Sequence, residues 1–128
     1  MPAAEADPRW LERSFGTLEG APREAWVQPP GDLDAAPPGG ESYRALAARV
    51  LAAVDDLRAG AARAGRPLDV LLCAHSGVLR MLAAIAADAP DAVRALDFGA
   101  RNGEAVALVY AAPATPRFLA SPSPGTAI

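Results

Sequence analysis

Three adjacent residues, His75, Ser76 and Gly77, are the first candidates for chemistry in this sequence. They follow a short apolar run, Leu68 to Ala74, and precede a segment with helical spacing. Ligands of open α/β sheets bind beyond the carboxyl ends of the strands, which is where this order of elements places them. The first free N–H groups of the helix, from about Gly77 to Leu79, would face an anion such as phosphate, and a neighbouring imidazole would be held protonated. The alternative is that His75 only satisfies a turn carbonyl.

Ser76 also invites comparison with the nucleophile elbow, G-x-S-x-G, of serine hydrolases. Here the two glycine positions are Ala74 and Val78, which suit the sharp turn poorly. A hydrolase triad further needs a histidine later in the chain, and His75 is the one histidine present. We therefore reject a serine nucleophile.

The elements that must position these residues alternate in type. Residues 41–64 carry the clearest helical pattern, with an apolar stripe and an end at Gly65 and Pro67. We expect Glu41 to be a favourable charge near the N-terminus of this helix rather than a catalytic group. Residues 68–74 predict a strand buried on both faces, residues 78–87 a second helix, and residues 104–110 an alternating strand. The order predicts an α/β fold with a parallel sheet. Few strands are present, so the sheet looks incomplete.

The remaining segments predict little regular structure. We expect a short extended segment over residues 7–15, a short helix near 22–27, a Pro/Gly-rich loop over 28–40, a helical turn within 88–96 and an irregular tail over 113–128 with one edge strand at 117–119. At 128 residues, the chain has room for a single domain.

Composition excludes several classes of function. All 12 basic residues are arginine, and 15 acidic residues leave a net charge of −3, so no basic field is available for duplex nucleic acid. One cysteine excludes an internal disulfide framework, and one histidine excludes a His-rich metal site. The longest apolar run, Val78 to Ala87, is too short to cross a membrane, and we identify no secretory signal. We expect a cytoplasmic protein.

Four stretches together resemble the histidine phosphatase superfamily, which includes cofactor-dependent phosphoglycerate mutases and α-ribazole phosphatases. They are Leu11 to Gly20, similar to the family's L-x-E-x-x-F-G-x-x-E-G segment; Pro38 to Ser42, similar to its P-G-G-E-S; Val70 to Leu82, similar to the strand and turn that bear its second histidine; and Asn102 to Val106, similar to a late N-G strand start. Their order and spacing agree over residues 7–112. The resemblance implies a phosphoglycerate mutase-like, three-layer α/β/α fold with a mostly parallel sheet.

The resemblance also assigns site residues. Glu12 matches the carboxylate that acts as general acid and base toward the leaving group, and His75 matches the histidine that contacts the transferred phosphoryl group. Arg13, beside that acid, is a candidate for contacting a substrate anion, with a solvated surface arginine as the alternative. Ser76 and Gly77 are candidates for phosphate binding. No metal or other cofactor is implied, and the substrate would be a small phosphorylated molecule, with a phosphatase favoured over a mutase.

The family's nucleophilic histidine, in an R-H-G motif on its first strand, has no match in this chain. We therefore expect an incomplete C-terminal portion of the fold, from truncation, a misplaced start codon or gene decay, that is inactive alone. An uncovered apolar sheet flank would then be open to a protein partner or to self-association. The alternatives are a non-catalytic module that binds a phosphorylated ligand or a protein, and an unrelated α/β domain in which Glu12 and His75 lie far apart.

Overall fold

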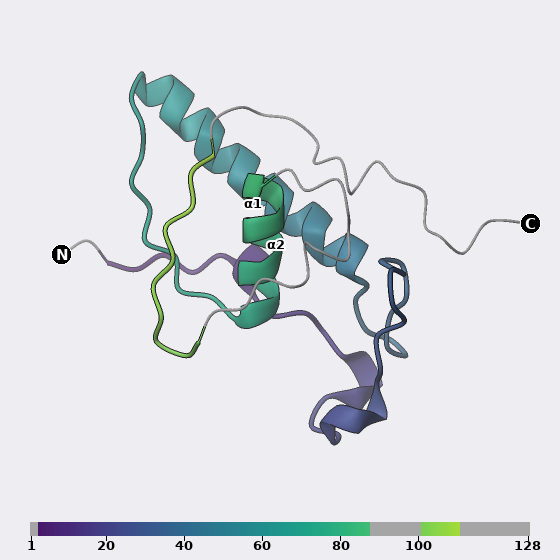
Figure 1. Cartoon of the computed structure of the whole chain (residues 1–128). Helices are drawn as coiled ribbons and strands as arrows, with labels where there is room; N and C mark the ends of the chain where they lie inside the picture. Colours follow the sequence, from purple (N-terminus) through teal and green to yellow (C-terminus); the bar gives the residue numbers. More distant parts are fainter. Residues whose placement is uncertain (1–2, 88–100, 111–128) are drawn as a thin grey trace, which may run out of the picture.

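The structure, a computed structural model, describes residues 3–87 and 101–110. Within these ranges the chain forms three short 3-10 helices, η1 (Pro8–Trp10), η2 (Gly16–Leu18) and η3 (Arg23–Ala25), followed by two α-helices, α1 (Tyr43–Ala64) and α2 (Ser76–Ala87). Helix α2 packs across α1, and the N-terminal segment passes beside both of them (Figure 1). The two α-helices therefore form the framework on which the other segments lie.

Helix α1 confirms the helix predicted over residues 41–64, and its local sequence explains both ends. The Ser42 hydroxyl accepts a hydrogen bond from the Ala45 N–H at 3.1 Å, which makes Ser42 the N-cap and moves the first helical residue to Tyr43. Gly65 adopts a left-handed conformation with φ of 63°, and its N–H returns to carbonyls of the last turn. Leu46, Val50 and Val54 are buried as the spacing predicts, whereas Leu57 is 38% exposed.

Helix α2 confirms the second predicted helix and begins two residues earlier than expected, at Ser76. Its buried side chains meet those of α1 in one core cluster, and Leu33 closes the cluster from the loop that precedes α1. The α2 members of this cluster are Val78, Met81, Leu82, Ala84 and Ile85. Burial of these apolar side chains between the helices is the main source of stability visible in the described residues.

The predicted sheet is wrong for the part of the chain that the structure describes. Residues 68–74 and 104–110, which were expected as strands, pair with no other segment there. Side chains in the first segment alternate: Leu72 and Ala74 pack against the core, while Leu71 is 96% exposed. A strand in a sheet needs a hydrogen-bonding neighbour as well as an apolar side. The apolar run in the sequence could indicate the apolar side but not the neighbour. The mostly parallel, three-layer α/β/α fold is thus not what these residues form.

Several smaller predictions also change or fall outside the described residues. The extended segment expected over 7–15 contains η1, which is capped by the Asp7 carboxylate accepting from the Arg9 N–H at 2.8 Å, and the short helix expected near 22–27 is the single turn η3. Residues 28–40 contain turns and bends. The helical turn at 88–96, the edge strand at 117–119 and the tail 113–128 lie outside the described residues. No helix within the described ranges is both long and apolar enough to cross a membrane.

Candidate functional site

The Glu12 carboxylate lies on the first turn of α2. One of its oxygens, Oε2, accepts a hydrogen bond from the Gly77 N–H at 3.1 Å, and the other, Oε1, accepts from the Arg13 N–H at 2.8 Å. Gly77 is the second residue of α2 and follows His75 by two positions. A negative charge at this end of a helix is favourable because the free N–H groups there carry partial positive charge. Residues 65 positions apart are thereby joined.

A side chain at position 77 would force the Glu12 carboxylate to shift from its place. A Cβ atom built on Gly77 would collide with Oε1 of Glu12 and would lie 3.1 Å from its carboxyl carbon. Glycine at position 77 thus allows the carboxylate to approach the backbone of α2 closely. This gives Gly77 a specific role that the sequence interpretation, which assigned it to phosphate binding, had not included.

The expectation of free N–H groups from Gly77 to Leu79 needs correction. The Gly77 N–H is bonded to Glu12, and the Leu79 N–H donates to the carbonyl oxygen of His75 at 3.0 Å. Ser76 begins the helix, and both His75 and Ser76 are exposed. His75 is therefore exposed directly before the start of α2, and the Gly77 N–H is already bonded to the Glu12 carboxylate.

Arg13 is buried, and so it is not the solvated surface residue given as the alternative. Its residue is 5% exposed, its Nε donates to the Glu41 carbonyl at 2.7 Å, and its Nη2 donates to the Gln28 side-chain oxygen at 3.0 Å. The guanidinium also stacks 4.1 Å from the centre of the Tyr43 ring. These contacts hold the N-terminal segment to the start of α1, so in this arrangement Arg13 stabilises the fold.

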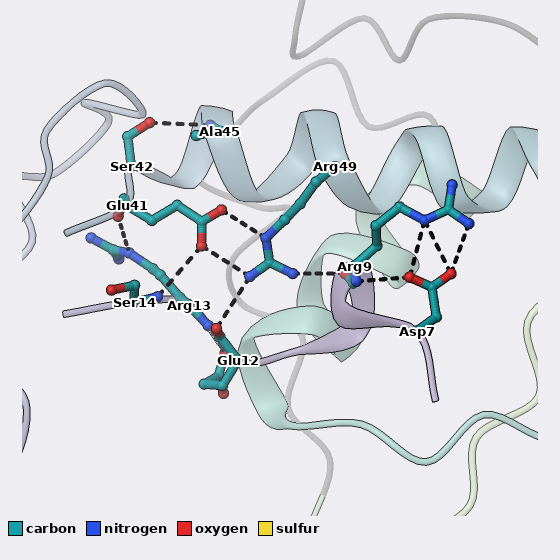
Figure 2. A network of polar contacts seen from close by, with 9 residues as sticks. All are labelled: Asp7, Arg9, Glu12, Arg13, Ser14, Glu41, Ser42, Ala45 and Arg49. Carbon is teal, nitrogen blue, oxygen red and sulfur yellow. Dashed lines mark hydrogen bonds and ion pairs between the residues drawn. The ribbon is translucent and has the colours of Figure 1, made fainter. Parts of the chain in front are cut away.

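A second arginine, Arg49 of α1, was missed as part of the site. Its guanidinium pairs with the Glu41 carboxylate through Nε to Oε1 at 2.7 Å and Nη2 to Oε2 at 2.9 Å, and it also donates to the carbonyls of Arg9 and Glu12 (Figure 2). The hydrogen bond from Arg49 is the main reason that the pKa of Glu41 lies below its ordinary value. Position 49 is three residues from Leu46 and four from Ala53, both buried, so helical spacing could have placed Arg49 at the edge of the core.

A shallow depression of about 590 Å³ lies beside this network. It is lined by residues from the 8–14 segment, the 34–42 loop and the first two turns of α1, and these include Glu12, Glu41 and Arg49. His75 is not among its lining residues. Within residues 3–87 and 101–110 the structure gathers no group of three side chains suited to holding a metal ion.

The site thus combines a carboxylate and an exposed histidine at one end of one helix, a pairing suited to proton transfer on an anionic ester. The model of the histidine phosphatase superfamily, branch 1, matches residues 2–115, which is most of the chain. The chain belongs to this superfamily. Searches of curated proteins and of solved structures returned no match.

Proposed function

We propose that this chain contributes the acid–base and phosphate-contacting side of a site that processes small phosphomonoesters. Glu12 would donate a proton to the leaving oxygen as the phosphorus–oxygen bond breaks and later accept one from the incoming water, and His75 would contact the phosphoryl oxygens. The observation that carries the proposal is the hydrogen bond between the Glu12 carboxylate and the Gly77 N–H, because it fixes the acid two residues from the histidine.

We further propose that the 128-residue chain does not turn over phosphomonoesters by itself. The superfamily's reaction passes the phosphoryl group to a nucleophilic imidazole while a second histidine contacts it, and this chain holds one histidine in total. His75 cannot fill both positions. A phosphatase and a mutase reaction would both lack the nucleophilic histidine. Of the two classes, we favour the phosphatase.

Two assays on the purified chain test these statements. The first follows hydrolysis of p-nitrophenyl phosphate and the appearance of acid-labile phosphate on the protein, in the wild type and in His75→Ala. We expect that neither hydrolysis nor acid-labile phosphate in the wild type exceeds its level in His75→Ala. Turnover or a phosphoprotein that disappears in His75→Ala would contradict the proposed inactivity.

The second assay measures binding of inorganic phosphate by ³¹P line broadening. His75→Ala should weaken binding, whereas Glu12→Gln should tighten it by about fivefold, since removing a negative charge near a dianion is worth about 1 kcal/mol in a largely aqueous setting. Glu24→Gln, which neutralises an exposed carboxylate of η3, is the matched control and should leave binding unchanged. Equal affinity in all four proteins would refute the proposed phosphate contact.

A second candidate is a non-catalytic module that associates through its apolar surface. The specific observation is that Leu71 is 96% and Val109 is 82% exposed, on two segments left without a strand partner in the described ranges. We propose self-association of two chains over this surface. Sedimentation equilibrium should show association that Leu71→Ser reduces, and a wild type that stays monomeric at high concentration would rule it out.

The remaining expectations stay proposals of the same kind. The acidic balance of 15 acidic to 12 basic residues speaks against a nucleic-acid partner. The exposed, free thiol of Cys73 suits a reducing compartment such as the cytoplasm.

A further inference from the structure

The segment that carries Glu12 has no regular structure of its own to hold it. Glu12 follows η1 by two residues, and residues 12–15 form neither helix nor strand. A general acid must be held to within a fraction of an ångström of its working position. Contacts with the rest of the molecule must therefore supply the rigidity.

Arg49 supplies these contacts from the second turn of α1. Its Nη1 donates to the carbonyl of Arg9, within η1, at 2.7 Å, and its Nη2 donates to the carbonyl of Glu12 itself at 3.1 Å. One planar group thus binds two carbonyls of this segment, those of Arg9 and Glu12 (Figure 2). An isolated backbone turn would otherwise offer these carbonyls to water.

The Glu41 carboxylate holds the guanidinium in the orientation that these bonds require. It binds the guanidinium through both oxygens, and its Oε2 also accepts from the Ser14 N–H at 3.4 Å. The Glu41 N–H in turn donates to the Ser14 carbonyl at 2.9 Å. Both side chains are largely buried, with 23% of Arg49 and 17% of Glu41 exposed, so water competes little for the pair.

We propose that Arg49, oriented by Glu41, is a positioning residue that sets where the Glu12 carboxylate stands on α2. The inference rests on the proposed function, in that Glu12 is the acid being positioned. Arg49 contacts the main chain of the acid and not the substrate. A lysine cannot replace it, because an ammonium group offers no planar fork to bind two carbonyls and a carboxylate together.

The alternative is an ion pair that stabilises the fold and leaves Glu12 where it is. The Gly77 amide distinguishes the two, because its N–H reports directly on the carboxylate bound to it. Amide shift and exchange at Gly77 should respond to Arg49 if Arg49 positions Glu12, whereas a purely stabilising pair would alter global unfolding alone.

The experiment records ¹H–¹⁵N spectra and amide exchange of the full chain as wild type, Arg49→Lys, Glu41→Gln and Glu12→Gln. Glu12→Gln identifies the shift of Gly77 when it no longer faces a charged carboxylate. We expect Arg49→Lys to move the Gly77 resonance toward that position and to speed its exchange about tenfold, the effect of losing one such hydrogen bond. Glu41→Gln should do the same to a smaller extent. Arg63→Lys, at an exposed site in the last turn of α1, is the matched control.

Two results would overturn the proposal. One is a Gly77 amide that keeps its wild-type shift and exchange in both Arg49→Lys and Glu41→Gln, even if both variants melt at lower temperature. The other is a Gly77 amide that does not respond to Glu12→Gln. Failure of the proposed function appears elsewhere, in phosphate binding that ignores His75→Ala and Glu12→Gln while the Gly77 amide still follows Arg49.

Discussion

Replacing Gly77 by alanine should change stability in opposite directions depending on whether Glu12 is present. In the native chain the added Cβ would collide with Oε1 of Glu12 and push the carboxylate off the Gly77 N–H. That hydrogen bond is worth about 1.5 kcal/mol, the low end for a charged acceptor, because Glu12 is only half-buried. Alanine returns about 0.5–1 kcal/mol through its better helix propensity. We expect a net loss of about 0.5–1 kcal/mol.

In a Glu12→Ala background the collision and the hydrogen bond are both gone. Gly77→Ala should then stabilise the chain by about 0.5–1 kcal/mol through helix propensity alone. The cycle therefore predicts a coupling free energy of about 1.5 kcal/mol between the two positions. Urea denaturation followed by circular dichroism at 222 nm measures all four proteins.

Gly60 of α1 provides the matched control for this cycle. A Cβ atom at Gly60 would meet Leu68 Cδ1 at 3.6 Å, an ordinary contact. Gly60→Ala should therefore stabilise the chain by a similar amount whether or not Glu12 is present. If Gly77→Ala has the same sign in both backgrounds, the contact between Glu12 and α2 does not operate in solution and the reasoning about the site fails.

Two further predictions concern the network and the core. The lowered pKa of Glu41 means that the unfolded chain binds a proton more readily than the folded one. The contribution of the Glu41–Arg49 pair to stability is therefore complete above the unfolded pKa near 4.5 and is lost as pH falls toward the folded value. Glu41→Gln should reduce the dependence of the urea midpoint on pH between pH 7 and pH 3. Leu46→Ala should cost about 2–5 kcal/mol because Leu46 is fully buried, while Leu57→Ala on the same stripe, with Leu57 38% exposed, should cost far less; similar losses in the two variants would contradict the described core.

Local patterns were sufficient to predict both α-helices. Ser42 before α1 and Gly65 after it satisfy the helix ends with their own atoms, and the spacing of Leu46, Val50 and Val54 marks the buried side. All of these signals lie within a few residues of the structure that they specify. Only the first residues differ from the prediction, by two positions in each helix, and in α1 the Ser42 cap decides where the helix begins.

The sheet could not be predicted in the same way, because a strand is defined by a partner distant in sequence. The run from Leu68 to Ala74 is apolar throughout, and this composition alone led to the prediction of a strand covered on both faces. In the described residues Leu72 and Ala74 face the helices and Leu71 faces solvent. The segment is therefore covered on one side only, contrary to the predicted burial on both faces, and no ladder forms there.

In the candidate site, too, the contacts between residues distant in sequence could not be predicted from local patterns. The family resemblance, and no local pattern, singled out Glu12, and the structure places its carboxylate beside the turn that carries His75. The inward direction of Arg13 depends on carbonyl and amide acceptors on a different loop, so neighbouring residues carry no sign of it. Charged side chains look alike in sequence whether they bind water or the protein's own backbone.

A single backbone amide ties the proposed chemistry to the fold. The Gly77 N–H donates to the Glu12 carboxylate, which on the proposed function is the form left behind once the acid has given its proton to a leaving group. The same N–H cannot serve a phosphate oxygen while Glu12 holds it. On the proposed function, anion recognition then falls to the exposed His75 beside it, and proton transfer to Glu12. On the proposed function, the two tasks are divided between His75, which directly precedes α2, and Glu12, which is bound to the second residue of α2, and the chain's single imidazole cannot also provide the nucleophile.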